Sequence, residues 1–451
     1  MKSVLILLRS YLLRDRFYIL WWVGGITALT LATALAVTRE FGSLDARVSL
    51  VAIAATNPAF LFLRGSPDGT SIGSLIFFQG FSFLAVLAAL MSVFLVVRHT
   101  RADEQSGRAE LISATRISRV APLVATVIAG ALVSIGAGVG VAAAMMVSGL
   151  EPAGSALTGA AVASVGAVFV GVAAIAAQIM PTARGANGLA SAAVGIAYLI
   201  RGIGDATGTP NAEASASDPH GVSWLSPIGW GQFTTPFSNP TVLPLLLSMM
   251  VFVGTVVVAV AVCARRDLGA SFVAEAPGRK RAAYLTRSPL GMALRLGRGT
   301  LIGWGIGGVT LGVLTGALAP TVAGALASNA TLSDLIARLV PGTEADIVDI
   351  FVSALLGICG VLAAAAGVAG VMRLHSEESE GRAEMILATP LPRTRWLLSH
   401  ITAAGIVVGA VALASGLTAG IVLAIVTDDW ARLFSSVGAA LAHIPAALVC
   451  V

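Results

Sequence analysis

Apolar stretches long enough to cross a lipid bilayer recur along the whole chain. A helix needs about 20 apolar residues to cross the hydrocarbon core, and helices satisfy their own backbone hydrogen bonds there. Strand-like alternation of apolar and polar residues is absent. The sequence therefore predicts an all-α polytopic membrane protein. Its ten predicted spans lie at residues 17–38, 77–97, 120–148, 156–180, 187–204, 241–263, 300–325, 349–372, 397–427 and 434–451.

The composition excludes a water-soluble fold of this length. Charged residues make up 11% of the chain, whereas soluble domains carry about 25%. The three cysteines, Cys263, Cys359 and Cys450, lie in apolar runs and lack the spacing of metal ligands. They are typical of small core residues, and no metal site is predicted.

The distribution of Lys and Arg predicts the orientation of the chain. Most of them fall in segments on the same side as the N-terminus, and cytoplasmic loops carry such an excess. We therefore place the N-terminus in the cytoplasm. The asymmetry explains the net charge of +5 without a nucleic-acid partner. Residues 1–16 form a basic amphipathic segment, which either lies along the membrane surface or extends the first span.

The segment that follows the second predicted span is repeated, with substitutions, after the eighth. Val97–Arg119 and Val371–Arg393 are identical at ten of 23 positions, at an offset of 274 residues. An even number of spans separates the copies, so both lie on one membrane face. We predict two parallel halves of six spans each, with the second incomplete. The predicted divisions are a first half at 1–264, a basic cytoplasmic linker at 265–299 and a second half at 300–451.

The repeat also leads to an expectation about length. At the same offset, Val451 corresponds to Ala177, inside the fourth span of the first half. We expect two further spans, about one hundred residues with their loops, in the native gene.

Each repeated segment is predicted to hold a short cytoplasmic helix. Positions three and four apart share a helix face, which groups Gly107, Glu110 and Leu111, with Glu104 one turn earlier. A small residue, a carboxylate and an apolar side chain together suit docking into a protein cleft, and the alternative is a solvated turn. The candidate interface residues are Glu104, Gly107, Arg108, Glu110 and Leu111, with Glu378, Gly381, Arg382, Glu384 and Met385 in the second copy.

The pattern E-x-x-G-R-x-E-x-[IL]-x-A-T-P resembles the cytoplasmic loop of type-two ABC exporter permeases. The second copy matches it from Glu378 to Pro390, whereas the first has Arg116 in place of that proline, which weakens its predicted helix stop. The segments Ser288–Trp304 and Trp224–Phe237 are similar to one branch of that family, the actinobacterial antibiotic and multidrug efflux permeases of the tetronasin-resistance type.

The resemblance implies how such a permease is driven. In that family the loop helix, called a coupling helix, docks into a cleft of a separately encoded ATPase subunit, here expected in two copies. The permease itself is expected in the bacterial inner (plasma) membrane. ATP and Mg²⁺ would bind that partner, and no cofactor is expected in this chain. The only lysines, Lys2 and Lys280, lie outside any phosphate loop. The chain is therefore predicted to be a transport subunit rather than an enzyme.

Two aromatic groups are further candidates. The first, at the outer part of the second span, either lines a substrate cavity or faces lipid; it comprises Phe77, Phe78, Gln79, Phe81 and Phe83. The second lies in the external loop between the fifth and sixth spans, where Trp224 and Trp230 form either an external gate or an aromatic membrane anchor.

The predicted function is export of lipophilic or amphipathic compounds such as antibiotics, with energy from ATPase partners. The first alternative is a secondary drug antiporter of the two-times-six-span type. Its loop motif has a basic run that is missing here, and proton coupling normally needs intramembrane carboxylates or histidines. No charged residue lies deep inside a predicted span, and His443 is the one candidate left. The second alternative is a non-transporting membrane scaffold.

Overall fold

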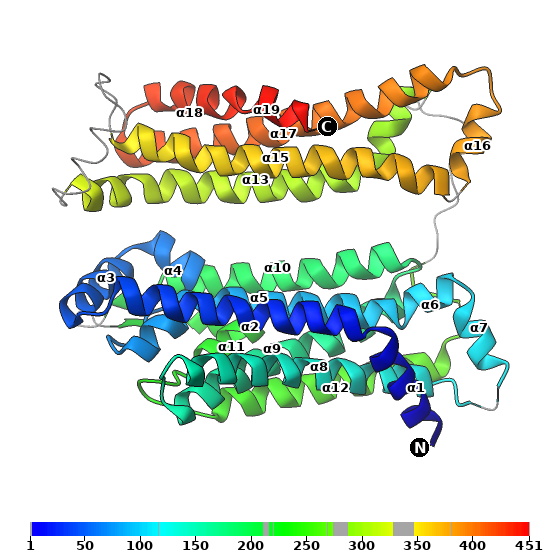
Figure 1. Ribbon diagram of the computed structural model, residues 1–451, viewed down its shortest axis with the longest axis horizontal. Coiled ribbons are helices and arrows are strands. Elements are labelled where there is room, and N and C mark those ends of the chain that lie inside the picture. Colours follow the sequence, from blue (N-terminus) through cyan, green and yellow to red (C-terminus); the bar gives the residue numbers. More distant parts are fainter. Residues whose placement is uncertain are drawn as a thin grey trace. The chain divides into compact units, whose positions relative to one another are not determined.

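The computed structural model describes residues 2–115, 117–210, 216–219, 221–267, 269–273, 287–327, 347–379 and 381–450. The chain divides into two compact units, Met1–Ala276 and Pro277–Val451. The division falls inside the predicted linker at 265–299. Each unit is a bundle of long helices (Figure 1).

The prediction of an all-α membrane protein with ten spans is confirmed. Within the described residues, ten helical segments are long and apolar enough to cross a membrane. The first unit contains α2 (Arg16–Glu40), α5 (Ile72–Arg98), α8 (Ala121–Val147), α9 (Pro152–Ile179), α10 (Ala183–Ala206) and α12 (Leu243–Arg265). The second contains α13 (Pro289–Ala327), α15 (Ile347–Ser379), α17 (Arg393–Thr427) and the pair α18 (Ala431–Ala442) and α19 (Ile444–Val449).

The tenth span differs from its prediction as one unbroken helix at 434–451. It consists of α18 and α19, which meet at His443. Pro445 has no backbone N–H to donate to Leu441, and its ring disfavours a continuous helix there. His443 packs close to Gly360 of α15, where a Cβ atom would lie 2.7 Å from the histidine Cβ.

The core of the first unit centres on α5, which is the most buried of its spans. Small residues let its neighbours α8 and α9 approach closely. A Cβ atom on Gly138 would lie 2.4 Å from the carbonyl oxygen of Gly159, so only glycine fits at this crossing. Small residues are the usual means of close helix contact in lipid, where apolar burial alone does not drive association.

The N-terminal segment forms a separate helix, α1 (Lys2–Arg14), with a break at Asp15 before α2. The alternative that it extends the first span is therefore wrong. Its buried side chains Leu7 and Tyr11 pack against Ala121 and Ala125 at the start of α8. Figure 1 shows α1 at the same end of the first unit as α6 and α7.

The opposite end of the first unit carries several short elements, which the sequence patterns did not predict (Figure 1). These elements are α3 (Leu44–Thr56), α4 (Pro58–Arg64), β1 (Thr209–Pro210), β2 (Ser217–Asp218), the 3-10 helix η1 (Gly221–Leu225) and α11 (Pro227–Gln232). The strands β1 and β2 pair antiparallel, with Thr209 opposite Asp218.

Candidate functional site

The two repeated segments fold into the same short helix, α7 (Arg108–Ser113) in the first unit and α16 (Arg382–Leu387) in the second. Both helices begin and end at positions 274 residues apart. Each follows a glycine in the left-handed region, with φ of 73° at Gly107 and 70° at Gly381. That conformation favours glycine, which accounts for its presence in both copies.

The C-terminal ends of the two helices are also alike. The Thr115 hydroxyl donates to the Ile112 carbonyl, and the Thr389 hydroxyl donates to the Ile386 carbonyl, both at 2.6 Å. The expectation of a weaker stop in the first copy is therefore not met, because α7 ends at the position equivalent to the end of α16 although its segment lacks the proline. Arg116, on which that expectation rested, lies outside the described residues.

Both helices present an acidic and an apolar side chain to the outside. Leu111 is 74% exposed and Met385 is 71% exposed, each beside an exposed carboxylate, Glu110 or Glu384. Among the described residues, neither carboxylate makes an ion pair or side-chain hydrogen bond. Each copy thus exposes one carboxylate that has no ion-pair partner among the described residues, next to one large, mostly exposed apolar side chain.

The inner faces of the two helices pack onto their own units. Ile112 lies against Leu7 and Tyr11 of the α1 cluster. Ile386 lies against Leu374 and Trp396, at the ends of α15 and α17. Each short helix is therefore held by apolar contacts on one side and open on the other.

Glu104 does not continue the face of Glu110, contrary to the expectation. It belongs to α6 (Arg101–Gln105), and the left-handed Gly107 separates α6 from α7. Its carboxylate forms ion pairs with Arg101 and Arg266. The equivalent Glu378 is exposed near the end of α15.

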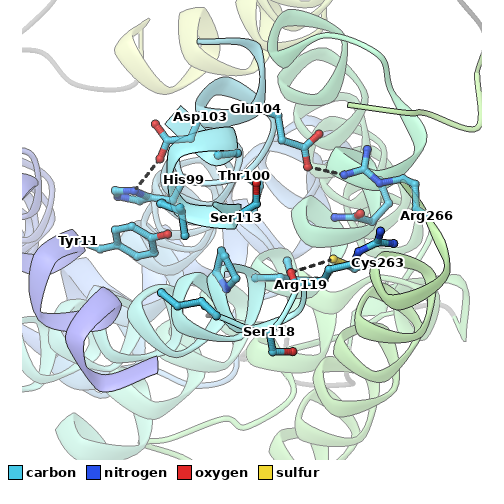
Figure 2. Close-up of a pocket in the computed structure, with 16 residues that line it drawn as sticks. Tyr11, His99, Thr100, Asp103, Glu104, Ser113, Ser118, Arg119, Cys263 and Arg266 are labelled. Atoms are coloured by element: carbon cyan, nitrogen blue, oxygen red, sulfur yellow. Dashed lines mark hydrogen bonds and ion pairs between the residues drawn. The ribbon is translucent and has the colours of Figure 1, made fainter. Parts of the chain in front are cut away.

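A buried charge cluster joins α7 to α1 and α5 (Figure 2). His99 lies between two carboxylates, with Nε2 2.6 Å from Asp15 and Nδ1 3.8 Å from Asp103. Arg14 and Arg108 reach Asp103 at 3.3 and 3.4 Å. Because Arg108 lies at the start of α7, its pair with Asp103 ties this short helix to the bundle.

Tyr11 closes one side of this cluster. Its ring stacks on the His99 ring, with centroids 4.2 Å apart. Burial, together with the nearby Asp103 carboxylate, raises the pKa of Tyr11 to about 12, so the phenol stays protonated at neutral pH. In the second copy an ion pair of 3.6 Å between Arg373 and Glu377 occupies the positions equivalent to His99 and Asp103. The Arg382 side chain lies outside the described residues.

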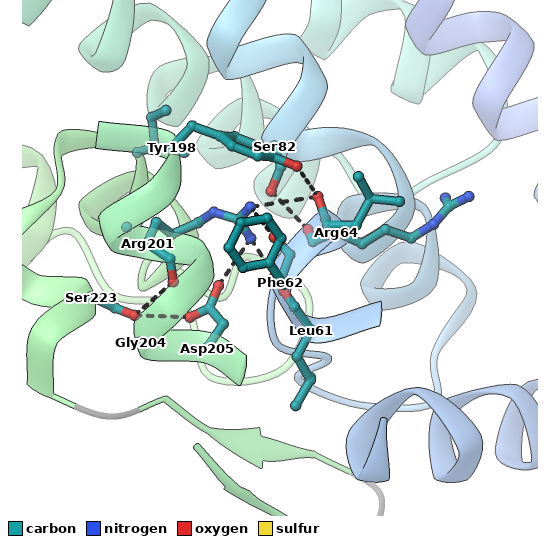
Figure 3. Close-up of polar contacts among 12 residues, drawn as sticks. Leu61, Phe62, Arg64, Ser82, Tyr198, Arg201, Gly204, Asp205 and Ser223 are labelled. Carbon is teal, nitrogen blue, oxygen red and sulfur yellow. Dashed lines mark hydrogen bonds and ion pairs between the residues drawn. The ribbon is translucent and has the colours of Figure 1, made fainter. Parts of the chain in front are cut away.

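The other end of the first unit holds a charge pair that the sequence reasoning missed (Figure 3). Arg201 and Asp205 of α10 are fully buried and 3.0 Å apart. Arg201 also donates to the Phe62 carbonyl of α4 at 2.7 Å, and the Ser223 hydroxyl of η1 donates to Asp205 at 3.0 Å. The sequence feature that could have indicated this pair is the spacing of four residues between opposite charges on a helix.

Arg201 lies near the end of the predicted span at 187–204 and is not among the candidate residues predicted from the sequence. The short helices α4 and η1 cover this end of α10, so the charges are buried although they lie near the end of a span. Removing two charges from water costs free energy that only close pairing and further hydrogen bonds offset. The pair therefore joins α10 to α4 and η1.

Two comparisons with known proteins bear on what this chain is. A family model described as "Multidrug efflux system permease Rv1217c, C-terminal domain" matches residues 286–451. The chain is also 34% identical over 444 residues to the multidrug efflux system permease protein Rv1217c of Mycobacterium tuberculosis. That alignment covers 98% of this chain and 78% of the relative. The chain belongs to this family of multidrug efflux system permeases.

In this permease, the tryptophans predicted at an external gate lie in two consecutive short helices, Trp224 in η1 and Trp230 in α11. Trp230 is buried and its indole N–H donates to the Trp224 carbonyl at 2.6 Å. Trp224 is half-exposed, and its ring stacks on Phe233 with centroids 4.4 Å apart. Ser226 caps α11 and donates to the Ala197 carbonyl of α10. Whether the two tryptophans act as a gate or an anchor stays open.

The phenylalanines of α5 lie in the core of the permease's first unit. Phe77, Phe78 and Phe81 are buried, so the alternative that the group faces lipid does not hold for these three, whereas Phe83 is exposed. The rings of Phe77 and Phe81 stack with centroids 4.7 Å apart. Gln79 accepts a hydrogen bond from Arg64 at the end of α4. That this group lines a substrate cavity stays a prediction.

Proposed function

We propose that this chain is the transmembrane permease of an ATP-driven exporter that moves lipophilic or amphipathic compounds out of the cell. Two copies of a separate ATPase subunit, which bind ATP and Mg²⁺, would dock on α7 and α16. The N-terminus and both short helices would then lie in the cytoplasm. The name of the relative, a multidrug efflux system permease, supports drugs as the substrates.

The observation that carries this proposal is the matched geometry of α7 and α16. Equivalent residues are exposed in both copies, Glu110 with Leu111 and Glu384 with Met385. A solvated turn has no need to expose a large apolar side chain next to an uncompensated carboxylate. Contacts at protein interfaces, by contrast, combine apolar anchors with charges that the partner complements.

The inner contacts of α7 suggest how movement of the ATPase would reach the membrane spans. Ile112 packs on α1, and Arg108 pairs with Asp103, which also pairs with Arg14. A push on α7 would therefore move α1 and the end of α5 together rather than bend a loose loop. Such discrete packed contacts transmit displacement between sites.

The test is the double variant Glu110→Arg with Glu384→Arg. Losing one partner of a buried interfacial charge pair costs roughly 2–5 kcal/mol, and the arginine adds repulsion or an unpaired charge. We expect the ATPase subunit to dissociate during purification and drug efflux to be lost, while the permease still accumulates in the membrane.

The matched control is Glu40→Arg, which reverses an exposed charge at the C-terminal end of α2, far from α7. It should leave both co-purification and efflux unchanged. If the double variant exports drugs and retains the ATPase as well as this control does, α7 and α16 are not the docking site.

A further inference from the structure

A cavity of about 350 Å³ opens beside the coupling helix of the first unit (Figure 2). Its wall is built by α1, by the segment from α5 to α7, and by the ends of α8, α9 and α12. Tyr11, Ile112, Ile117 and Leu123 supply much of its apolar surface, and most of the other lining residues carry polar or charged side chains. The cavity lies within the first unit and does not involve the proposed ATPase surface of Glu110 and Leu111.

Three buried polar atoms on this wall lack a hydrogen-bond partner among the described residues. They are Gln178 Oε1, Arg266 Nε and His99 Nδ1, the last of which faces the Asp103 carboxylate at 3.8 Å, beyond hydrogen-bond distance. The Arg266 side chain is only 6% exposed. Buried polar groups are rarely left without a partner, so three on one cavity wall indicate that something polar occupies it.

The charges on the wall favour an anionic occupant. Both carboxylates are already neutralised: Asp103 pairs with Arg14 and Arg108, and Glu104 pairs with Arg101 and Arg266.

Arg119, by contrast, pairs only with the exposed Asp267, at 3.4 Å, among the described residues. Because this pair is exposed to solvent, it compensates the Arg119 charge only weakly. A cation in the cavity would therefore be repelled by Arg119, whereas a phosphate would be attracted to it.

The positions of Arg119 and Arg266 indicate which kind of molecule would carry that phosphate. Arg119 precedes α8 by two residues, and Arg266 directly follows α12. Both guanidinium groups therefore lie at the ends of membrane spans, which is the level of lipid headgroups. Basic pockets between spans at this level are suited to anionic headgroups.

An apolar groove adjoins the cavity and suits an acyl chain. It has a volume of about 240 Å³ and lies between α9 and α12, with Ile175, Ile179, Val258 and Val262 among its lining residues. Gln178 lines both the groove and the polar cavity. A polar cavity joined to an apolar groove matches a molecule with a charged head and a hydrocarbon tail.

We propose that this cavity and groove bind one anionic phospholipid, with the phosphate between Arg119 and Arg266 and one acyl chain along α9 and α12. Ala109, Ile112 and Ser113 of α7 belong to the wall, so the bound headgroup contacts the coupling helix directly. The lipid thereby fills the space behind α7 and holds its inner face in place.

The test titrates the purified full chain with lipids and counts bound molecules by native mass spectrometry. The probes are dioleoyl phosphatidylglycerol, dioleoyl phosphatidylcholine and inorganic phosphate, with dodecyltrimethylammonium as a cationic amphiphile. We expect phosphatidylglycerol to saturate one site at least about tenfold more tightly than phosphatidylcholine, as one charge-assisted contact implies. Neither inorganic phosphate nor the cationic amphiphile should displace it at comparable concentration.

Two variants separate headgroup from tail. Arg119→Gln should reduce phosphatidylglycerol affinity roughly tenfold, whereas Arg9→Gln, an exposed arginine of α1 outside the cavity, should not. Val258→Trp fills the groove and should weaken dioleoyl but not dihexanoyl phosphatidylglycerol.

Equal affinity for the two phospholipids, or equal effects of Arg119→Gln and Arg9→Gln, would overturn the proposal. So would displacement by inorganic phosphate or the cationic amphiphile at the lipid's own concentration, or an equal effect of Val258→Trp on both chain lengths. Each measurement uses the permease alone, so the outcome is independent of whether an ATPase docks on α7.

Discussion

At the scale of single residues, the buried pair of Arg201 and Asp205 is the clearest case of a side chain whose role depends on its neighbours. Arg201 donates to carbonyls at the end of α4 and stacks over Tyr198, at 4.7 Å from the ring centroid. The Asp205 carboxylate accepts a hydrogen bond from the Ser223 hydroxyl. The two charges thus join α10, α4 and η1.

We predict that Asp205→Ala strongly destabilises the first unit. The change leaves the Arg201 guanidinium buried without its counter-charge, which costs about 3–5 kcal/mol. A thermal unfolding midpoint measured in detergent by intrinsic tryptophan fluorescence should fall by several degrees. Asp218→Asn, at an exposed aspartate of β2 at the same end, is the control and should have no effect.

The double variant Arg201→Met with Asp205→Leu separates pairing from packing. Replacing both charges with apolar side chains of similar size removes the unpaired charge, so much of the lost stability should return. A double variant as unstable as Asp205→Ala would show that the ion pair is not what holds this end together.

At the scale of elements, α7 and α16 show that one backbone design recurs in both units. In each copy a left-handed glycine sets the start of the helix, and a threonine hydroxyl bonded to the carbonyl three residues earlier marks its end. Because the two ends are alike, Glu110→Arg and Glu384→Arg should be equally damaging as single variants.

We predict that Gly107→Ala and Gly381→Ala each weaken export. A Cβ atom at either glycine meets nothing within 4 Å, so the substitution acts only through the backbone. A left-handed conformation costs an L-residue roughly 1–2 kcal/mol, which should loosen or reorient the short helix. Drug accumulation in whole cells measures the effect.

The matched control for this prediction is Gly136→Ala. Gly136 lies inside α8 with an ordinary helical backbone, and a Cβ atom there also meets nothing within 4 Å. Alanine is favoured over glycine in a helix interior, so this variant should export normally. Loss of export in the control, or normal export in both test variants, would contradict the role of the left-handed glycines.

At the scale of the whole molecule, the two ends of the first unit carry different short elements. The N-terminal α1 lies with α6 and α7 at one end, and α3 and α4 lie at the other (Figure 1). The Lys and Arg distribution predicts that the end with α7 is cytoplasmic.

We predict that an impermeant maleimide added to intact cells labels a cysteine at Leu225 but not at Leu111 or Met385. All three side chains are exposed, at 72%, 74% and 71%, so accessibility within the protein is matched. The background replaces the native cysteines with alanine. All three positions should react after permeabilisation, and labelling of Leu111→Cys in intact cells would reverse the orientation.

The sequence by itself determined the membrane class, the ten spans, the internal repeat and the short helix in each copy. These features follow from local information, since the length of an apolar run and the pattern around Gly107 or Gly381 do not depend on distant contacts. Span boundaries agree to within several residues except at α13, where the helix begins at Pro289 rather than 300, and at the break at His443.

Only the tertiary structure decided which polar residues are buried and what they contact. The Glu104 carboxylate pairs with Arg266, which is 162 residues away in the sequence. The Asp15 carboxylate contacts His99, which is 84 residues away. Arg201 is buried because α4 and η1 cover it, which no pattern in α10 reveals. Helix formation is governed by nearby residues, whereas desolvation and ion pairing depend on which distant segments fold together.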